Sequence, residues 1–251
     1  MKKSPVINSV VDSFKILDLI SEHHEMGIAD IAKQLELPKT TVFRIIKSLE
    51  EAKVIKQLNN ANYALDYHML HYANSVITNE DITQIAESFM QEAVDLTGET
   101  INLGMEYNQD LVILKRIHGD FYQLQTALRP VGQLYCSGMG KLFLSQWSDE
   151  KLKTYFQDLP KRTINTVNTF ELFKANQKEI INDHISIDNE EYEYGMSCYA
   201  VPIFDKNGKV VYALSVSGPT GRLEYKGIDF LTSTLKQCAQ NIQDVIIAQD
   251  I

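Results

Sequence analysis

The order of helix-like and strand-like segments in this 251-residue sequence predicts an α+β protein built from two modules. About 50 residues at the start repeat apolar positions with the period of an α-helix, and two short strand-like segments follow them. The remainder mixes apolar strands with longer helical stretches. We therefore expect a first module at residues 1–66, a linker helix at 67–80 and a second module at 81–251.

Three helices open the first module. Apolar residues at helical spacing predict a helix from Asn8 to His23, Gly27 interrupts the pattern, and a shorter stripe predicts a second helix from Ile28 to Leu35. The third helix follows Pro38, a residue tolerated in a first helical turn. Its apolar residues share one face at i, i+3, i+4 and i+7: Val42, Ile45, Ile46 and Leu49.

The opposite face of the third helix carries Thr40, Arg44 and Lys47. A solvated surface of an ordinary amphipathic helix has the same pattern, so the neighbouring segments decide between the two interpretations. Two strand-like runs, at 54–58 and 63–65, enclose the turn-rich tetrapeptide NNAN. This order is that of a winged helix-turn-helix domain, whose third helix enters the DNA major groove.

The predicted partner of this face is double-stranded DNA. Arg44 is suited to bidentate contact with guanine, whereas threonine and lysine serve phosphates or thymine methyl groups. The net charge of −9 does not exclude DNA, because residues 1–66 hold nine basic and nine acidic residues and are neutral. The predicted DNA-binding residues are Lys39, Thr40, Thr41, Arg44 and Lys47.

The second module is predicted to be an antiparallel sheet with helices at its sides. The sequence DKNG between two apolar runs predicts a β-hairpin, because Asn-Gly tolerates positive φ. In chain order the expected elements are a helix at 81–96, strands at 99–107, 111–119 and 123–128, helices at 137–146, 148–156 and 169–187, the hairpin at 200–217 and a closing helix that carries Leu231, Leu235, Ile242 and Ile246 on one face.

Composition places the protein in a reducing compartment. Cys136, Cys198 and Cys238 are an odd, widely spaced set with no CxxC pair, which argues against a disulfide framework. No apolar run approaches the roughly 18–20 residues of a membrane span, and no signal peptide is recognisable. We expect a cytoplasmic protein without a membrane partner. His68 and His71 lack further ligands at matching spacing, so neither a metal site nor a cofactor is expected.

Four segments together resemble the IclR-type transcriptional regulators over essentially the whole chain. They are LPKTTVFRIIKSLEEAKVI, TGETINLGM, RPVGQLYCSGMGKLFLS and GMSCYAVPIFDKNGKVVYALSVSGP. The resemblance implies a winged-helix domain, a linker helix and a sensor domain of GAF-like topology. It also implies a homodimer or a dimer of dimers that binds a palindromic operator and responds to a small organic acid or an aromatic compound.

Two positions depart from the usual family form. A histidine-alanine pair before the sensor helix is replaced by Tyr135 and Cys136, and a glycine common after the wing is replaced by Asp66. The first change concerns the neighbourhood of the effector, and the second concerns the linker.

The segment SGMGK is similar to a phosphate-binding loop but fails its pattern. Tyr135 stands where the first glycine should be, and Leu142 stands where Ser or Thr should bind magnesium. A helix N-terminus with small residues remains, which favours either a small anion or tight helix packing. The family resemblance implies that the backbone amides of Gly138 and Met139 hold an effector carboxylate.

Further pocket residues are expected on strands. Ser215 and Ser217 alternate, so both face one side of the sheet. Asp188 and Cys198 flank the EEYEYG turn, and the resemblance places both in the effector pocket. Taken alone, Asp188 is typical of a solvated loop acid. In a pocket it would accept a hydrogen bond from an effector hydroxyl or be protonated, and Cys198 would form a small wall.

The predicted function is that of a sequence-specific transcriptional regulator, a repressor of a catabolic operon released by a sugar acid or a keto acid. One alternative is an activator that responds to an aromatic acid. A second is an enzyme with Cys198 as nucleophile, His184 as base and Asp188 as orienting group. A third is a helical interaction module without DNA contact. We expect no catalytic residue.

Overall fold

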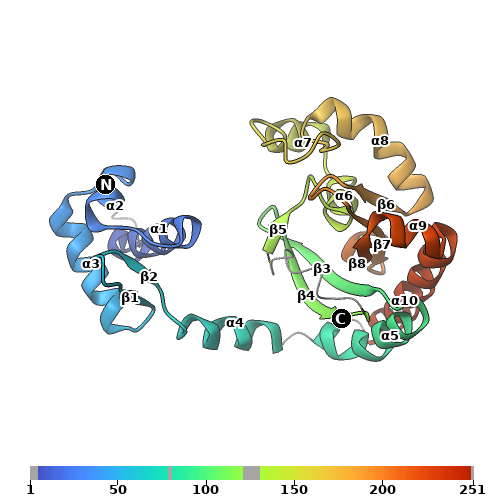
Figure 1. Cartoon of the computed structure of the whole chain (residues 1–251), viewed down its shortest axis with the longest axis horizontal. Helices are drawn as coiled ribbons and strands as arrows, with labels where there is room; N and C mark the ends of the chain where they lie inside the picture. Colours follow the sequence, from blue (N-terminus) through green and yellow to red (C-terminus); the bar gives the residue numbers. More distant parts are fainter. Residues whose placement is uncertain (1–4, 79–80, 121–130, 250–251) are drawn as a thin grey trace. The chain divides into compact units, whose positions relative to one another are not determined.

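The computed structural model describes residues 5–78, 81–120 and 131–249. Two compact units divide the chain between residues 79 and 80. The first contains three helices, a two-stranded hairpin and a fourth helix, and the second contains a six-stranded sheet with helices on both faces (Figure 1). The α+β class and the winged helix-turn-helix predicted from the sequence are confirmed.

The first unit follows the predicted order. Its elements are α1 (Asn8–His23), α2 (Ile28–Gln34), α3 (Lys39–Glu51), β1 (Ile55–Gln57), β2 (Tyr63–Leu65) and α4 (Met69–Thr78). The apolar faces of the three helices meet in a core that includes Ile16, Ile20, Ile31 and Ile46. Pro38 lies directly before α3 with φ −57°, so the ring constrains the backbone just where the helix begins.

The wing is attached to the helices by its second strand. β1 and β2 pair antiparallel with Lys56 opposite Ala64. Tyr63 also exchanges backbone hydrogen bonds with Met26, at 2.9 and 3.0 Å, which joins the hairpin to the segment between α1 and α2. The buried ring of Tyr63 then closes the core from that side.

The second unit is built on one antiparallel sheet with the order β5-β4-β3-β8-β7-β6. Its elements in chain order are α5 (Asp81–Thr97), β3 (Thr100–Tyr107), β4 (Asp110–Ile117), β5 (Val131–Gln133), α6 (Gly138–Leu144), α7 (Asp149–Tyr155), α8 (Phe170–Asp183), β6 (Ser186–Asn189), β7 (Met196–Phe204), β8 (Val210–Pro219), α9 (Thr220–Lys226) and α10 (Ile228–Gln249).

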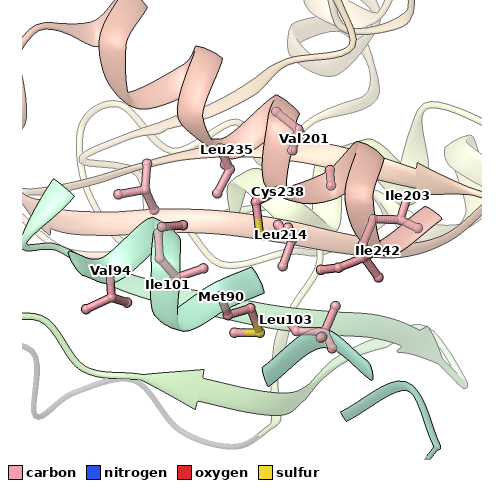
Figure 2. Packing of buried hydrophobic residues seen from close by; sticks show 14 of the residues in the cluster. Met90, Val94, Ile101, Leu103, Val201, Ile203, Leu214, Leu235, Cys238 and Ile242 are labelled. Carbon is pink, nitrogen blue, oxygen red and sulfur yellow. The ribbon is translucent and has the colours of Figure 1, made fainter. Parts of the chain in front are cut away.

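One face of this sheet is apolar and is covered by α5 and α10. Figure 2 shows side chains of both helices packed against side chains of the strands. Residues opposite each other in neighbouring strands share a face, and here Ile101 pairs with Val216 and Leu103 pairs with Leu214. The labelled core residues are Met90, Val94, Ile101, Leu103, Val201, Ile203, Leu214, Leu235, Cys238 and Ile242.

The opposite face of the sheet carries α6 and a second apolar cluster. Met139, Leu142 and Phe143 of α6 pack there with Phe173 of α8. Strand residues on this face include Asn102, Ser215 and Ser217, whose polar side chains lie beside the cluster rather than within it. The sheet therefore separates an apolar core from a partly polar layer, and the layer contains the cavity described below.

The prediction of a helix at 169–187 is wrong at its C-terminal end. α8 ends at Asp183, His184 adopts a left-handed conformation with φ 53°, and residues 186–189 form β6. The burial pattern of β6 is inverted, because Ser186 and Asp188 are buried while Ile187 is 43% exposed. A strand with its polar residues inside does not show the usual alternation. Asp188 is consequently a strand residue and not a loop acid.

The expected strand at 123–128 lies outside the described residues, and β5 was not predicted. The described helices also lack the combination of length and apolar character that a bilayer span requires.

Candidate functional site

The polar face of α3 is exposed as the sequence predicts. Arg44 and Lys47 are exposed, whereas Val42, Ile45 and Ile46 are buried in the core. Lys39 and Thr40 are exposed as well, and Thr41 is half-buried. All five predicted DNA-binding residues therefore lie on or beside one accessible helical surface.

Sequence reasoning missed Phe43 on this surface. Its side chain is 49% exposed, and its position four residues from both Lys39 and Lys47 puts it on their side of the helix. An aromatic residue can contact a thymine methyl group. The sequence signal for Phe43 was its position, because it is an apolar residue outside the i, i+3, i+4, i+7 stripe of the third helix.

Three hydrogen bonds engage side chains that could otherwise contact phosphates, one at Lys47 and two in the wing. Lys47 Nζ donates to Glu50 Oε2 at 2.7 Å, and this hydrogen bond raises the lysine pKa. In the wing, the side chains of Asn60 and Asn62 both donate to Glu25 Oε1, at 2.8 and 3.0 Å. The amide side chains of these two asparagines thus hold the wing loop to Glu25.

A cavity opens on the polar layer of the second unit. Its volume, counted as the space open to the centre of a water-sized sphere, is about 130 Å³. This is roughly ten times the volume that one water molecule needs. Its walls come from the six strands β3 to β8, the start of α6 with the residue before it, and the turn after β6. The lining includes Asn102, Leu111, Ile113, Arg116, Gly132, Gln133, Ser137, Met139, Asp188, Tyr192, Glu193, Met196, Ser197, Cys198, Ser215 and Ser217.

Five of the six predicted effector residues meet at this cavity. Met139, Asp188, Cys198, Ser215 and Ser217 line it. Gly138 lies behind the wall, because a Cβ added there would be 2.9 Å from the sulfur of Cys198. Pairing of Asp188 with Cys198, and of Cys198 with Ser217, places those three residues on one face of adjacent strands.

The contacts of the SGMGK segment bear on both of its interpretations, tight helix packing and a site for a small anion. A Cβ at Gly140 would lie 2.2 to 2.6 Å from backbone atoms of Leu134, so tight packing requires that glycine. The Ser137 hydroxyl accepts a hydrogen bond from the Gly140 amide at 3.0 Å and caps α6. Ser137 and Met139 nevertheless reach the cavity wall.

The lysine of the same segment has a structural role. Lys141 is buried, and its ammonium group donates to the Ile187 carbonyl and pairs with the buried carboxylate of Glu191. Glu191 Oε2 also accepts the Val167 amide at 3.2 Å. A phosphate-binding loop would present this lysine to its ligand, so the contacts agree with the failure of the sequence pattern.

Asp188 has an unusual electrostatic environment. Burial raises its pKa to about 7, although the positive charge of Lys141 and the amides of Glu191 and Tyr192 act in the opposite direction. Its Oδ1 accepts those amides at 2.7 and 3.3 Å. The carboxyl group therefore changes between its neutral and charged forms near neutral pH, at the wall of the cavity.

The strand residues of the cavity form a hydrogen-bonded set that sequence analysis missed. Asn102 Nδ2 donates to Ser215 Oγ at 3.2 Å and to Ser217 Oγ at 3.1 Å. Arg116 Nε donates to Asn102 Oδ1 at 2.7 Å. A buried-face asparagine in an apolar strand, INLGM, was the signal available for Asn102, whereas nothing local marks Arg116.

The geometry does not support a cysteine enzyme. Burial raises the pKa of Cys198 to about 12, so the thiol is protonated and weakly nucleophilic at neutral pH. His184 packs its ring against Phe204, with centroids 5.1 Å apart, and it is not part of the cavity lining. Within the described ranges no three His, Cys, Asp or Glu side chains are arranged to hold a metal ion.

Comparison with known proteins identifies both units. Residues 74–244 match the family described as the bacterial transcriptional regulator IclR C-terminal domain, and residues 9–58 match the IclR helix-turn-helix domain.

Individual relatives extend over nearly the whole chain. The HTH-type transcriptional regulator KdgR of Dickeya chrysanthemi is 28% identical over 97% of this chain and 81% of its own length. The DNA-binding transcriptional repressor YiaJ of Escherichia coli K12 is 26% identical over 94% of this chain and 86% of its own length. The crystal structure of Thermotoga maritima IclR is 26% identical and covers 95% of this chain and 98% of its own, with a TM-score of 0.64.

These similarities agree with an exposed polar helix face in one unit and a polar-walled cavity in the other. The relatives are transcriptional regulators and not enzymes. The chain belongs to the IclR family of bacterial DNA-binding transcriptional regulators.

Proposed function

We propose that this protein represses a catabolic operon and is released from its operator by a small organic acid of the sugar-acid or keto-acid class. In this proposal α3 reads the major groove of a palindromic operator, and the cavity of the second unit binds the acid. The naming of YiaJ as a repressor supports the direction of regulation.

The observation that carries the proposal is the cavity itself. Most buried side chains of the sheet are apolar, yet Asn102, Asp188, Ser215 and Ser217 are buried together on one face beside an open volume. Buried polar groups need partners, and a small polar ligand would supply more of them. The predicted roles are carboxylate contacts from the amides of Gly138 and Met139 and hydroxyl contacts from Asp188.

Two copies of the recognition helix are expected on each operator. Because residues 1–66 carry no net charge, a single copy offers few phosphate contacts and should bind weakly at physiological salt. On α4, Leu70 is 63% exposed and Tyr72 is 56% exposed, which suits a helix that pairs with a second copy. We expect a homodimer or a dimer of dimers.

Release requires the acid to prefer one arrangement of the subunits. A ligand that binds both arrangements equally shifts nothing, whereas a preference of a few kcal/mol is sufficient. In this proposal the acid favours an arrangement whose two recognition helices no longer match the spacing of the half-sites.

Selection from random DNA followed by a titration tests the proposal. The purified protein should enrich a palindrome, and one of a panel of sugar acids, keto acids and aromatic acids should release it. Asp188→Ala and Ser215→Ala should retain operator affinity and lose release. Enrichment of no sequence would contradict DNA recognition, and equal midpoints for wild type and both variants would contradict the assigned site.

A second ligand class is favoured by the apolar part of the cavity lining. Leu111, Ile113, Met139 and Tyr192 line the same cavity and could enclose an aromatic ring. Release by benzoate-type acids, with no response to sugar acids or keto acids, would select this alternative.

A further inference from the structure

The turn between β6 and β7 forms one part of the cavity wall. It spans residues 190–195, and two of its side chains, Tyr192 and Glu193, line the cavity. A turn has no neighbouring strand to pair with, so its backbone carbonyls need other hydrogen-bond donors where they are withdrawn from water. The position of Tyr192 therefore depends on what holds this turn.

The segment 162–166, in the connection between α7 and α8, supplies those donors. Four of its side chains donate to the successive carbonyls of residues 189–192: Asn165 Nδ2 to Asn189 at 3.1 Å, Thr163 Oγ1 to Glu190 at 2.6 Å, Thr166 Oγ1 to Glu191 at 2.8 Å and Arg162 Nε to Tyr192 at 2.9 Å. Asp188 Oδ1 accepts two amides of the same turn. The turn is thus bonded through both its carbonyls and its amides.

Arg162 also contacts a side chain of the cavity wall. Its guanidinium carbon lies 3.9 Å from the centre of the Tyr192 ring, over the ring face. A cation in this position is attracted to the aromatic face. One arginine therefore binds both the ring and the backbone carbonyl of Tyr192, and the ring cannot turn away without losing the guanidinium contact.

This pair differs from another cation–ring pair of the same unit. Lys151 lies over the ring of Trp147 at 3.2 Å, but Trp147 does not line the cavity. Arg162 is exposed and is not itself part of the lining. Its contact with the cavity wall is made through Tyr192, as expected of a residue that positions another.

We propose, building on the effector-binding function proposed above, that Tyr192 is a specificity-determining residue of the cavity and that Arg162 is its positioning residue. The ring forms a fixed wall for the carbon skeleton of the acid. Because the Tyr192 amide donates to Asp188, this wall adjoins the carboxyl group assigned to the ligand hydroxyl, and the carboxylate contacts at the start of α6 stay as assigned. A preformed wall binds a ligand without the entropic cost of ordering a mobile side chain.

The mobility of the Tyr192 ring tests the positioning step without a ligand. Protein labelled with fluorotyrosine is studied by fluorine NMR, and the Tyr192 resonance is identified by its absence in Tyr192→Phe. The resonance should become narrower in Arg162→Ala and in Arg162→Gln, because a ring released from the guanidinium reorients faster. Arg162→Gln keeps a hydrogen-bond donor for the turn. Lys151→Ala is the matched control, since it removes a cation from a ring outside the cavity lining and should leave the Tyr192 line width unchanged.

Calorimetry tests the binding step. Pyruvate, D-gluconate and benzoate, together with any acid that releases the operator, are titrated into wild type and the variants. Arg162→Ala should weaken binding of the acid by about 5- to 10-fold. The same loss should occur in a Tyr192→Phe background, which keeps the ring, and no further loss should occur in a Tyr192→Ala background, which removes it. Lys161→Ala, which removes the neighbouring exposed charge, should bind the acid as wild type does.

The outcomes separate the two proposals. If the Tyr192 line width is the same in wild type and both Arg162 variants, the positioning role is wrong. If the loss of affinity persists in the Tyr192→Ala background, or if Lys161→Ala shares it, Arg162 acts through charge or backbone and its assignment to the ring is wrong. Neither result bears on the effector function. If no acid binds wild type or releases the operator, the effector function itself is contradicted, and the specificity role of Tyr192 falls with it.

Discussion

Helix α3 and the cavity of the second unit place polar side chains in opposite settings. On α3, Arg44 and Lys47 extend from one continuous helix into solvent, opposite buried residues of the same 13-residue segment. In the cavity, Asn102, Arg116 and Ser215 come from three strands and meet across up to 113 positions of sequence. One site is local and exposed, and the other is assembled and enclosed.

This difference determines how each site tolerates change. A side chain on an exposed helix surface can be replaced at little cost to stability, so its substitution reports on DNA contact alone. A side chain in the cavity wall packs against neighbours and shares hydrogen bonds with them, so its substitution affects stability and ligand binding together. Four predictions test this contrast, in order of decreasing effect.

Gly140→Ala should destabilise the second unit by about 3 kcal/mol or more, because the new Cβ would overlap backbone atoms of Leu134. Gly221→Ala in α9 is the control, since a Cβ there meets nothing within 4 Å. Urea unfolding followed by circular dichroism measures both variants. Equal stability of the two alanine variants would show that α6 can move away from residue 134.

Asp188→Asn should change how stability depends on pH. Since burial raises the pKa of Asp188 to about 7, the folded chain keeps a proton that the unfolded chain releases near pH 4. The contribution of this carboxyl group to stability is therefore lost as pH rises toward 7. Between pH 5 and pH 8 wild type should lose about 2–3 kcal/mol that the variant retains. Parallel urea midpoints across this range would contradict the raised pKa.

Arg44→Ala should weaken binding to the selected operator by about 1–3 kcal/mol and relax base preference at one position of each half-site. Its effect on the free energy of unfolding should be small, because the side chain is exposed. Fluorescence anisotropy with operator and random DNA separates the two kinds of binding. An equal loss on both DNAs would assign Arg44 to the phosphates.

Lys39→Ala should flatten the dependence of DNA affinity on salt by about one counterion, as expected for a phosphate contact. Lys47→Ala should flatten it less, because Lys47 is engaged with Glu50 at 2.7 Å and must break that bond to reach DNA. Anisotropy titrations at several salt concentrations give both slopes. A larger decrease in this slope for Lys47→Ala than for Lys39→Ala would indicate that the ion pair between Lys47 and Glu50 opens on DNA.

The first helix shows how far local patterns reach. Its predicted limits, Asn8 to His23, agree with the structure because its apolar stripe and the break at Gly27 are both encoded within one segment. The end of α8 was missed for the reverse reason. Ser186 and Asp188 face inward because β7 and α6 pack against β6, so no local alternation marked this strand.

The sequence by itself determined the class of this protein and the exposed polar face of α3 that is predicted to meet DNA. Helical periodicity is a property of neighbouring residues, and it sorts Arg44 from Ile45 without reference to the rest of the chain. Tertiary structure alone decided that Arg116 lies at the cavity and that Asn102 connects it to Ser215 and Ser217. Those contacts depend on strand order and register, which bring distant segments together through packing that no short stretch of sequence encodes.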